Sequence, residues 1–389
     1  MTTDKVLYLV MVTNTDNHNK YYKMIPNFPV SGQFTVEYGR IGATAMKRVY
    51  SMKDWDSKYK EKTRKGYKDK SHLHTDHVLP SDSGEYSPII SPVISSFVQK
   101  LQNFANCKLQ SSYKVSSAEV TPLMIKEANK LIASLSNAVF ITEYNNILLE
   151  LFSVIPRKMS NVNDFLLNDM KNRYKIIQDE QDLLDVMSAK VSQNQKIISE
   201  QNGENKESTI LDAYHLDIRE CSDLEINNIK RHLGTETLAK FKNAYRVVNK
   251  LTEDKFNTYV NANHLDKKDI HFYYHGSKNE NFWGIITEGL RLNPNAVITG
   301  KMFGHGLYFA SNTCKSIKTG FIAVYKVAYK KPLDVYSWES KYKLYRQSDM
   351  IRHHTDALFA HKGSMLVNDE LIVYQEQQAT LRYVIELEL

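Results

Sequence analysis

Apolar residues recur at helical spacing through residues 91–191, and this run separates two stretches of strand-like sequence. The first stretch, residues 5–80, contains the segment GQFTVEYGRIG, whose alternation places Phe34 and Val36 on one face of a strand. The last stretch, residues 210–389, holds short β-type runs with short helices between them. This order predicts a multidomain α+β protein with an all-α bundle in its middle.

Two polar segments divide the chain into three domains. Residues 80–90 and 192–209 are poor in apolar side chains, which is typical of linkers. We therefore predict a β-rich module over residues 1–80, a helical bundle over residues 88–200, and a mixed α+β domain with mainly antiparallel strands over residues 208–389.

The bundle is expected to begin with an amphipathic helix. The segment SPVISSFVQKLQNFA carries Pro92 near its start and sets four apolar residues at helical spacing: Val93, Phe97, Leu101 and Phe104. These four side chains are predicted to form one stripe that faces the core.

Positive charge is concentrated at the N-terminus. The net charge of the chain is +7, and residues 1–80 hold 14 Lys and Arg against 8 Asp and Glu. Lys58, Lys62 and Lys65 lie at i, i+4 and i+7, which predicts a basic helix face. A polyanion such as nucleic acid is the expected partner, and a merely solvated basic surface is the alternative.

Cysteine usage, hydropathy and histidine spacing exclude several classes. Cys107, Cys221 and Cys314 lie far apart, so neither a disulfide framework nor a zinc site is expected, as in a reducing compartment. No apolar run approaches a membrane span of about 20 residues, and we expect no signal peptide. The segment HLHTDH (72–77) has the residue types of a metal site, but its irregular spacing favours a solvated turn.

A glycine-rich stretch, GKMFGHGLYFASN (300–312), matches neither the dinucleotide fingerprint nor a phosphate loop. It is one of three stretches that set a polar or aromatic residue at a strand end or beside glycine. The others are YYHGS (273–277) and VNDELIVYQ (367–375). We expect the backbone to approach a ligand closely at these places.

Together these stretches resemble the catalytic domain of the poly(ADP-ribose) polymerases of the diphtheria-toxin-like class. His275 in His-Gly-Ser, Tyr308 in Gly-Leu-Tyr-Phe-Ala and Glu370 in Asn-Asp-Glu match the His–Tyr–Glu triad of that family in order and context. EYGRIG resembles the signature of the WGR domain, with Tyr38 in place of the tryptophan. Residues 91–191, with LFSVIPR, resemble the helical regulatory domain.

The resemblance implies NAD as substrate and no metal. Breaking the nicotinamide–ribose bond is expected to pass through an oxocarbenium-like transition state, beside which the Glu370 carboxylate can place negative charge. The resemblance assigns catalysis to Glu370, His275 and Tyr308. It assigns NAD binding to His275, Gly276, Ser277, Arg291, Tyr308, Lys315 and Ser316. It assigns nucleic-acid binding to Tyr38, Gly39 and Arg40, of which Arg40 is also expected to link DNA to the helices.

The chain departs from the family pattern where a second tyrosine would stack on nicotinamide, because Thr319 stands there. The ring is then expected to be held from one side, or from the second side by another residue such as Tyr325. Met302 matches a residue on the acceptor side, and residues 292–299 match the loop that lines the donor pocket.

The expected function is DNA-break-stimulated transfer of ADP-ribose from NAD to proteins, with nicotinamide released and poly(ADP-ribose) formed, in the DNA damage response and repair. DNA ends would bind residues 1–80. The enzyme is expected to be a monomer without membrane contact, in the nucleus or, for a bacterial source, the cytoplasm. Two alternatives remain open: a mono(ADP-ribosyl)transferase, and a DNA-binding scaffold with an inactive transferase domain.

Overall fold

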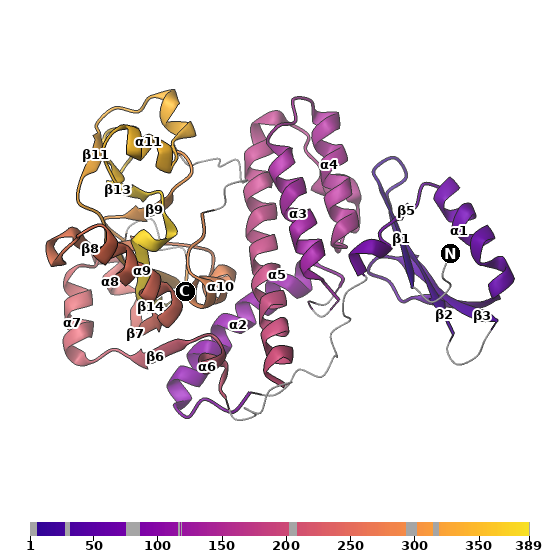
Figure 1. Ribbon diagram of the computed structural model, residues 1–389, viewed down its shortest axis with the longest axis horizontal. Helices are drawn as coiled ribbons and strands as arrows, with labels where there is room; N and C mark the ends of the chain where they lie inside the picture. Colours follow the sequence, from indigo (N-terminus) through magenta and orange to yellow (C-terminus); the bar gives the residue numbers. More distant parts are fainter. Residues whose placement is uncertain are drawn as a thin grey trace. The chain divides into compact units, whose positions relative to one another are not determined.

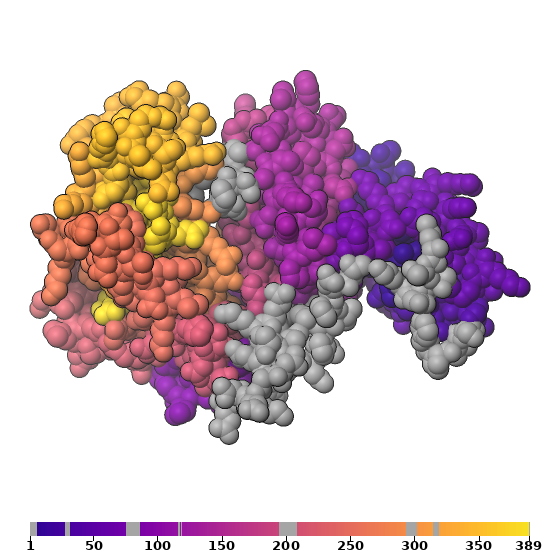
Figure 2. All heavy atoms as spheres, in the orientation of Figure 1, coloured from indigo at the N-terminus to yellow at the C-terminus, as the bar shows by residue number. Residues whose placement is uncertain are grey.

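The computed structural model describes residues 6–27, 32–74, 86–115, 117, 119–201, 208–292, 302–313 and 319–388, with side chains in the long helix that ends at Gln201 described through residue 193. The chain divides into two compact units. One takes residues 1–83, 107–195 and 295–297, and the other takes residues 84–106, 196–294 and 298–389. Figure 1 labels the elements of each unit, and Figure 2 draws their atoms as spheres.

The N-terminal module is a five-stranded antiparallel sheet with one helix, as predicted (Figure 1). The strand order is β4-β3-β2-β1-β5, and the elements are β1 (Leu7–Thr13), β2 (His18–Pro26), β3 (Gln33–Arg40), β4 (Met46–Ser51), α1 (Trp55–Arg64) and β5 (Lys68–Asp69). The alternation in β3 is confirmed, because Phe34 and Val36 are fully buried and pack with Trp55 of α1. One face of the sheet therefore makes the core of the module.

His74 ends the 3₁₀ turn Ser71–His74 and packs against the ring of Tyr8, with ring centres 4.1 Å apart. The expectation of a solvated turn over residues 72–77 is therefore wrong for His74, and residues 75–77 lie outside the described residues. Burial lowers the pKa of His74 from 6.5 to about 4, with the charge of Lys23 contributing. The fold thus requires the neutral imidazole.

This pKa predicts that acid weakens the packing of His74 against β1. An unfolded chain takes up a proton near pH 6.5, whereas the folded chain resists it down to about pH 4. Stability is therefore present above pH 6.5 and is lost as the pH falls toward 4, by about 2 kcal/mol between pH 7.5 and 5. Hydrogen exchange of the β1 amides in the whole chain measures this loss.

The variant His74→Gln should reduce the extra loss of β1 protection at pH 5. The matched control is His72→Gln, because His72 lies on the same turn and is exposed. An equal acid response in wild type and His74→Gln would contradict the prediction.

Four helices build the predicted bundle: α2 (Pro92–Ser112), α3 (Pro122–Leu135), α4 (Ile141–Val154) and α5 (Arg173–Gln201). The 3₁₀ turns Val162–Phe165 and Met170–Asn172 lie between α4 and α5. The Thr121 hydroxyl caps α3 by accepting a hydrogen bond from the amide of Met124 at 3.2 Å. Because α5 continues to Gln201, the first residues of the predicted linker 192–209 are helical, which corrects that prediction.

The buried stripe of α2 starts one residue later than predicted. Val93 is 39% exposed, whereas Ile94 is 4% exposed and packs in the core with Phe97 and Leu101. The helix therefore turns the i, i+3, i+7 set that begins at Ile94 toward the core.

The C-terminal domain is built on a nine-stranded sheet of order β11-β12-β13-β9-β8-β10-β14-β7-β6 (Figure 1). Neighbouring strands are antiparallel except β11 and β12, as the sequence predicted for the most part. The strands are β6 (Leu216–Glu220), β7 (Phe241–Asn249), β8 (Ile270–His275), β9 (Leu307–Ala310), β10 (Phe321–Ala328), β11 (Pro332–Val335), β12 (Ala357–Ala360), β13 (Glu370–Val373) and β14 (Ala379–Leu387). The helices are α6 (Ile210–Ala213), α7 (Asp223–Arg231), α8 (Thr235–Ala239), α9 (Lys250–Ala262), α10 (Phe282–Glu288) and α11 (Gln347–Arg352).

The first half of α2 belongs to the same unit as this sheet. Phe97 stacks on Tyr245 of β7 with ring centres 3.9 Å apart. The Lys100 ammonium lies 2.6 Å from the carboxylate of Glu386 on β14. Burial and ion pairing thus fasten residues 92–106 to the nine-stranded sheet.

None of the helices in the described ranges is long and apolar enough to cross a membrane.

Candidate active site and candidate nucleic-acid interface

Three neighbouring strands carry the predicted triad. His275 is the last residue of β8, Tyr308 lies on β9, and Glu370 is the first residue of β13. Ala310 of β9 pairs with Tyr274 on one side and with Glu370 on the other. The backbones of Tyr274 and Glu370 are therefore two strand spacings apart, about 10 Å. The fold brings together three residues that the sequence spreads over almost a hundred positions.

The imidazole of His275 is oriented by the backbone of β9. Its Nδ1 lies 3.0 Å from the carbonyl oxygen of Tyr308. Because a carbonyl only accepts hydrogen bonds, Nδ1 carries a proton and donates it to this contact. Phe309 and Tyr325 pack edge-on against the imidazole. The His275 ring is thus held in one orientation.

The side chain of Tyr308 fixes the loop before its own strand. Its hydroxyl accepts a hydrogen bond from the amide of Phe303 and donates one to the carbonyl of Gly304, both at 3.0 Å. Burial raises the pKa of this phenol well above its usual range, and the nearby charge of Glu370 adds to the effect. The hydroxyl therefore stays protonated, and the neutral Tyr308 side chain holds Phe303 and Gly304 in place by these two hydrogen bonds.

Two glycines of the 300–312 stretch are required by the protein's own packing. Gly304 has a φ of +79°, and a Cβ built on it would lie 2.2 Å from the backbone oxygen of Tyr345. A Cβ on Gly306 would lie 2.2 Å from the side chain of Ile372 on β13. Packing against neighbouring protein segments thus explains both glycines, and their closeness to a ligand stays a prediction. Gly300 lies outside the described residues.

The segment after β8 holds further predicted NAD contacts. Gly276 is exposed, and the Ser277 hydroxyl accepts a hydrogen bond from the Asn281 amide group at 3.0 Å. Arg291 is mostly exposed and pairs with Glu288 at 2.8 Å. These residues are presented around α10. Lys315 and Ser316, and residues 293–299 of the loop, lie outside the described residues.

Neither Thr319 nor Tyr325 replaces the missing second tyrosine. Thr319 donates a hydrogen bond to the carbonyl of Phe321 at 3.0 Å and brings no ring. Tyr325 is 1% exposed and lies in the core, so the suggestion that it supplies a second stacking face is wrong. Met302 is half-buried, and its carbonyl accepts a hydrogen bond from the Trp338 indole at 2.9 Å.

Sequence reasoning missed the residues that support this site from a distance. The hydroxyl of Tyr374 donates to the carbonyl of Phe303 at 2.6 Å, and the amide of Gly320 donates to the Asn279 side chain at 2.8 Å. Asn281 was also missed, although its place four residues after Ser277 is a usable signal for a side-chain contact.

The N-terminal module presents Tyr38 at the end of β3. Its ring lies 5.9 Å from that of Tyr22 and 5.9 Å from the guanidinium carbon of Arg48, which is exposed on the edge strand β4. The Lys62 ammonium lies 4.4 Å from the ring centre of Tyr22. We call Tyr22, Tyr38, Arg48 and Lys62 the tyrosine–cation patch. Tyr22 is 3% exposed and underlies the patch, so contact with a ligand would fall to Tyr38 and the two cations, a combination that suits sugars and phosphates.

The other two lysines of the predicted basic face contact an acidic neighbour. Lys58 and Lys65 both pair with Glu61, at 3.4 and 2.7 Å, so the predicted basic face is partly neutralised. Burial lowers the pKa of Lys62, which covers aromatic rings instead of projecting freely. The predicted helix is confirmed, and the structure adds that two of the three lysines share Glu61 while the third covers aromatic rings.

Arg40 contacts the segment between α4 and α5. Its guanidinium donates hydrogen bonds to the carbonyl oxygens of Met159 and Ser160, at 3.2 and 2.8 Å, and to the backbone of Asn17. A Cβ built on the preceding Gly39 would meet only the carbonyl oxygen of Thr44, at an ordinary van der Waals distance of 3.6 Å. The module and the helices are therefore joined through Arg40, whereas its contact with nucleic acid stays a prediction.

In the part of the chain that is described, no group of three His, Cys, Asp or Glu side chains could hold a metal ion. The mixed sheet with His, Tyr and Glu on neighbouring strands defines a catalytic domain of the ADP-ribosyltransferase type.

Comparison with known proteins agrees with this class. The family model of the poly(ADP-ribose) polymerase catalytic domain matches residues 223–326, and that of the WGR domain matches residues 6–74. Uncharacterized protein 101L of Invertebrate iridescent virus 6 is 36% identical over 196 residues, which cover 49% of this chain and 80% of that protein. The chain therefore belongs to the poly(ADP-ribose) polymerase family, with a WGR domain ahead of its catalytic domain.

Coverage of other relatives differs widely. Putative poly(ADP-ribose) polymerase-like 100L of the same virus is 26% identical over 181 residues, 44% of this chain and 97% of that protein. Poly(ADP-ribose) polymerase 1 of Xenopus laevis is 31% identical over 142 residues, which are 35% of this chain but only 12% of that protein. The matched catalytic segment ends before Glu370, so the role of this residue rests on its motif and on its place beside Tyr308.

Proposed function

We propose that this chain transfers ADP-ribose from NAD to protein acceptors, releases nicotinamide, extends the product to poly(ADP-ribose), and is stimulated by DNA breaks. It would act as a monomer in the DNA damage response. Its site of action would be the nucleus, or the cytoplasm if the source is bacterial.

The observation that carries this proposal is the meeting of His275, Tyr308 and Glu370 on β8, β9 and β13. The His275 ring is oriented by the contact of its Nδ1 with the Tyr308 carbonyl, and it would bind a ribose hydroxyl of NAD. Tyr308 offers a ring face whose orientation is fixed by its own hydroxyl. Both residues bind and orient NAD in this proposal.

Glu370 would act at the reacting centre. The nicotinamide leaves with the electron pair of its bond to ribose C1, and positive charge develops on the ribose. The Glu370 carboxylate stabilises that charge, and it accepts the proton of the acceptor oxygen as this oxygen bonds to C1. In elongation, the acceptor oxygen is a ribose hydroxyl of an ADP-ribose unit already attached.

Gel mobility of the modified protein distinguishes the possible products. A ladder of slowly migrating species supports polymer formation, whereas a single discrete shift identifies a mono(ADP-ribosyl)transferase. If NAD is neither consumed nor an NAD analogue retained, the chain is a scaffold with an inactive transferase domain. The same assay with and without broken DNA tests regulation, because equal rates would remove it.

DNA is proposed to bind through residues 1–80, with the tyrosine–cation patch near the phosphates and sugars. The patch replaces Lys58 and Lys65 in this role, because both are already paired with Glu61. The family resemblance implies that the helices restrain NAD entry until DNA binds. In that case a coupling free energy links the DNA-binding site to the NAD-binding site.

Salt dependence tests the patch. DNA affinity should fall steeply with salt, and Arg48→Gln should reduce the slope of log K against log salt by about 1. Lys65→Gln is the matched control, because it removes the same charge at an exposed position that pairs with Glu61. Fluorescence anisotropy with a labelled DNA end measures both. A slope unchanged by Arg48→Gln but reduced by Lys65→Gln would contradict this assignment.

A further inference from the structure

Side chains of the WGR domain form hydrogen bonds with the backbone of a segment that lies between α4 and α5. Asn19, which is fully buried, donates a hydrogen bond to the carbonyl of Arg157 at 3.1 Å. Arg40 donates to the carbonyls of Met159 and Ser160. Asn17 completes the contact by accepting a hydrogen bond from the amide of Val162 at 2.8 Å. We call residues 157–162 the held segment.

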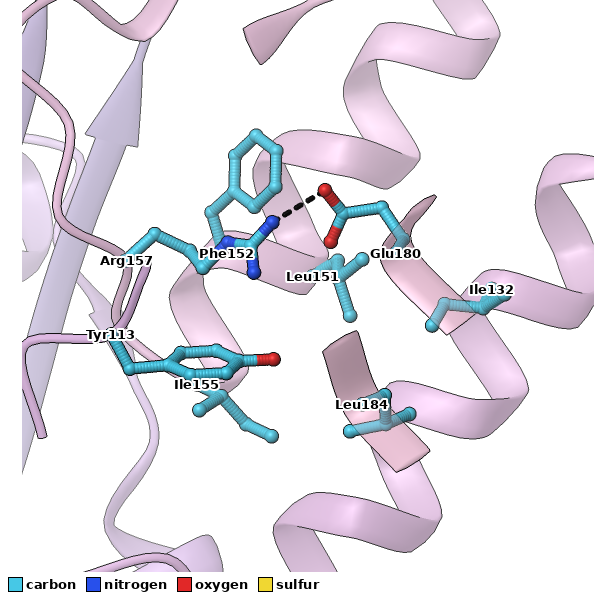
Figure 3. Close-up of a pocket in the computed structure, with 8 residues that line it drawn as sticks. All are labelled: Tyr113, Ile132, Leu151, Phe152, Ile155, Arg157, Glu180 and Leu184. Atoms are coloured by element: carbon cyan, nitrogen blue, oxygen red, sulfur yellow. Dashed lines mark hydrogen bonds and ion pairs between the residues drawn. The ribbon is translucent and has the colours of Figure 1, made fainter. Parts of the chain in front are cut away.

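The side chain of Arg157 runs the other way, into the interior of the bundle (Figure 3). Its guanidinium lies 5.0 Å from the ring centre of Tyr113 and 5.6 Å from that of Phe152. Its Nη2 donates a hydrogen bond of 2.5 Å to the Glu180 carboxylate on α5. Arg157 is 5% exposed and Glu180 is 8% exposed, so this ion pair is buried. Arg157 thus contacts the WGR domain through its backbone and the core of the bundle through its side chain.

The buried pair is imperfectly satisfied. Nε and Nη1 of Arg157 have no hydrogen-bond partner of good geometry among the described residues. They lie at a small cavity whose other lining is mostly aliphatic, including Ile132, Leu151 and Leu184 (Figure 3). Burial raises the pKa of the Glu180 carboxyl even though Arg157 opposes the shift. Burial opposes it, yet the charge of Glu180 raises the pKa of the Arg157 guanidinium, so the two shifts favour opposite balances of desolvation and attraction. The geometry decides the point: a buried ion pair with two unsatisfied donor atoms is a weak point in a protein core.

We propose that the Arg157–Glu180 pair is a latch through which the WGR domain sets the stability of the helical bundle. While the held segment keeps its place, Arg157 stays paired and the bundle stays closed. A shift of this segment when DNA binds withdraws Arg157, leaves Glu180 as a lone buried charge, and loosens α4 and α5. This inference rests on the proposed regulation of ADP-ribose transfer by DNA.

Three variants of the whole chain test the latch. Arg157→Met and Glu180→Leu each leave one uncompensated buried charge, so the amides of α4 and α5 should exchange about tenfold faster or more. The double variant Arg157→Met/Glu180→Leu replaces the pair by apolar side chains and should slow exchange to the wild-type rate or below. Hydrogen exchange followed by mass spectrometry gives these rates without DNA or NAD.

NAD consumption should follow the same order. Each single variant should consume NAD faster than wild type in the absence of DNA, and the double variant should respond less to broken DNA. Lys130→Met/Glu127→Leu is the matched control, because this exposed pair on α3 lies in the same bundle. It should leave both the exchange of α4 and α5 and the response to DNA unchanged.

Exchange in the double variant as fast as in the single variants would overturn the latch, and so would full DNA stimulation of the double variant. Failure of the proposed function looks different. If wild type consumes no NAD, or consumes it equally with and without DNA, the regulatory role falls, while the exchange rates still decide whether the pair controls the bundle.

Discussion

Glu370→Gln should lower NAD-dependent modification by about 100- to 10,000-fold, because the amide can neither neutralise the developing charge on the ribose nor accept a proton. The substitution keeps the size of the side chain and the backbone pairing of residue 370 with Ala310 and Ala360. The length of the polymer should fall together with the rate of modification. Nicotinamide release and gel mobility of the product measure the two effects.

Thermal unfolding should be nearly unchanged by Glu370→Gln, which separates a chemical role from a structural one. Glu339→Gln serves as the control, because Glu339 is an exposed carboxylate of the same domain, 56% exposed in its side chain. Polymer of normal length from Glu370→Gln, or an equal loss from Glu339→Gln, would remove the role assigned to Glu370.

Gly304→Ala should destabilise the catalytic domain by more than about 4 kcal/mol, in the range that only a few mechanisms reach. The new methyl group would lie 2.2 Å from the backbone oxygen of Tyr345 and 2.6 Å from its nitrogen. Backbone atoms cannot rotate away as a side-chain tip can. The loop would have to leave the Tyr308 hydroxyl, which bonds both Phe303 and Gly304. Urea unfolding of the whole chain and NAD turnover should both record the loss.

Gly363→Ala separates the clash from the backbone conformation. Gly363 also has a positive φ, +96°, but nothing lies within 4 Å of the position of its Cβ. Its substitution should therefore cost only the left-handed conformation, about 1–2 kcal/mol. Equal effects at the two positions would show that the contact with Tyr345 is not the cause.

The arrangement of domains and the triad could be predicted because their signals are local. Period-two alternation in β3 and helical periodicity in α2 to α5 are written in consecutive residues, and both are found. His275, Tyr308 and Glu370 each sit in a short recognisable motif, so their meeting followed from family resemblance even though the sheet order did not. The three domain boundaries and the roles of the site residues stay predictions.

The remaining features depend on contacts between residues distant in sequence. Gly304 must be glycine because of Tyr345, forty-one positions away, and no local pattern reveals that neighbour. Lys62 of α1 fits a basic helix face by its spacing, yet its ammonium lies over the ring of Tyr22 on β2. Tyr325 fits a ligand contact by residue type, yet β10 lies inside the sheet and buries it.

Helix α2 has a consequence for anyone who cuts this protein into fragments. Residues 84–106 belong with the catalytic sheet, although they precede the bundle in sequence. A fragment that starts at residue 208 would lose Phe97 from the face of Tyr245 and Lys100 from Glu386. The exposed aromatic surface would favour aggregation. A shortened enzyme should therefore carry residues 84–106 along, either through their native connection or by circular permutation.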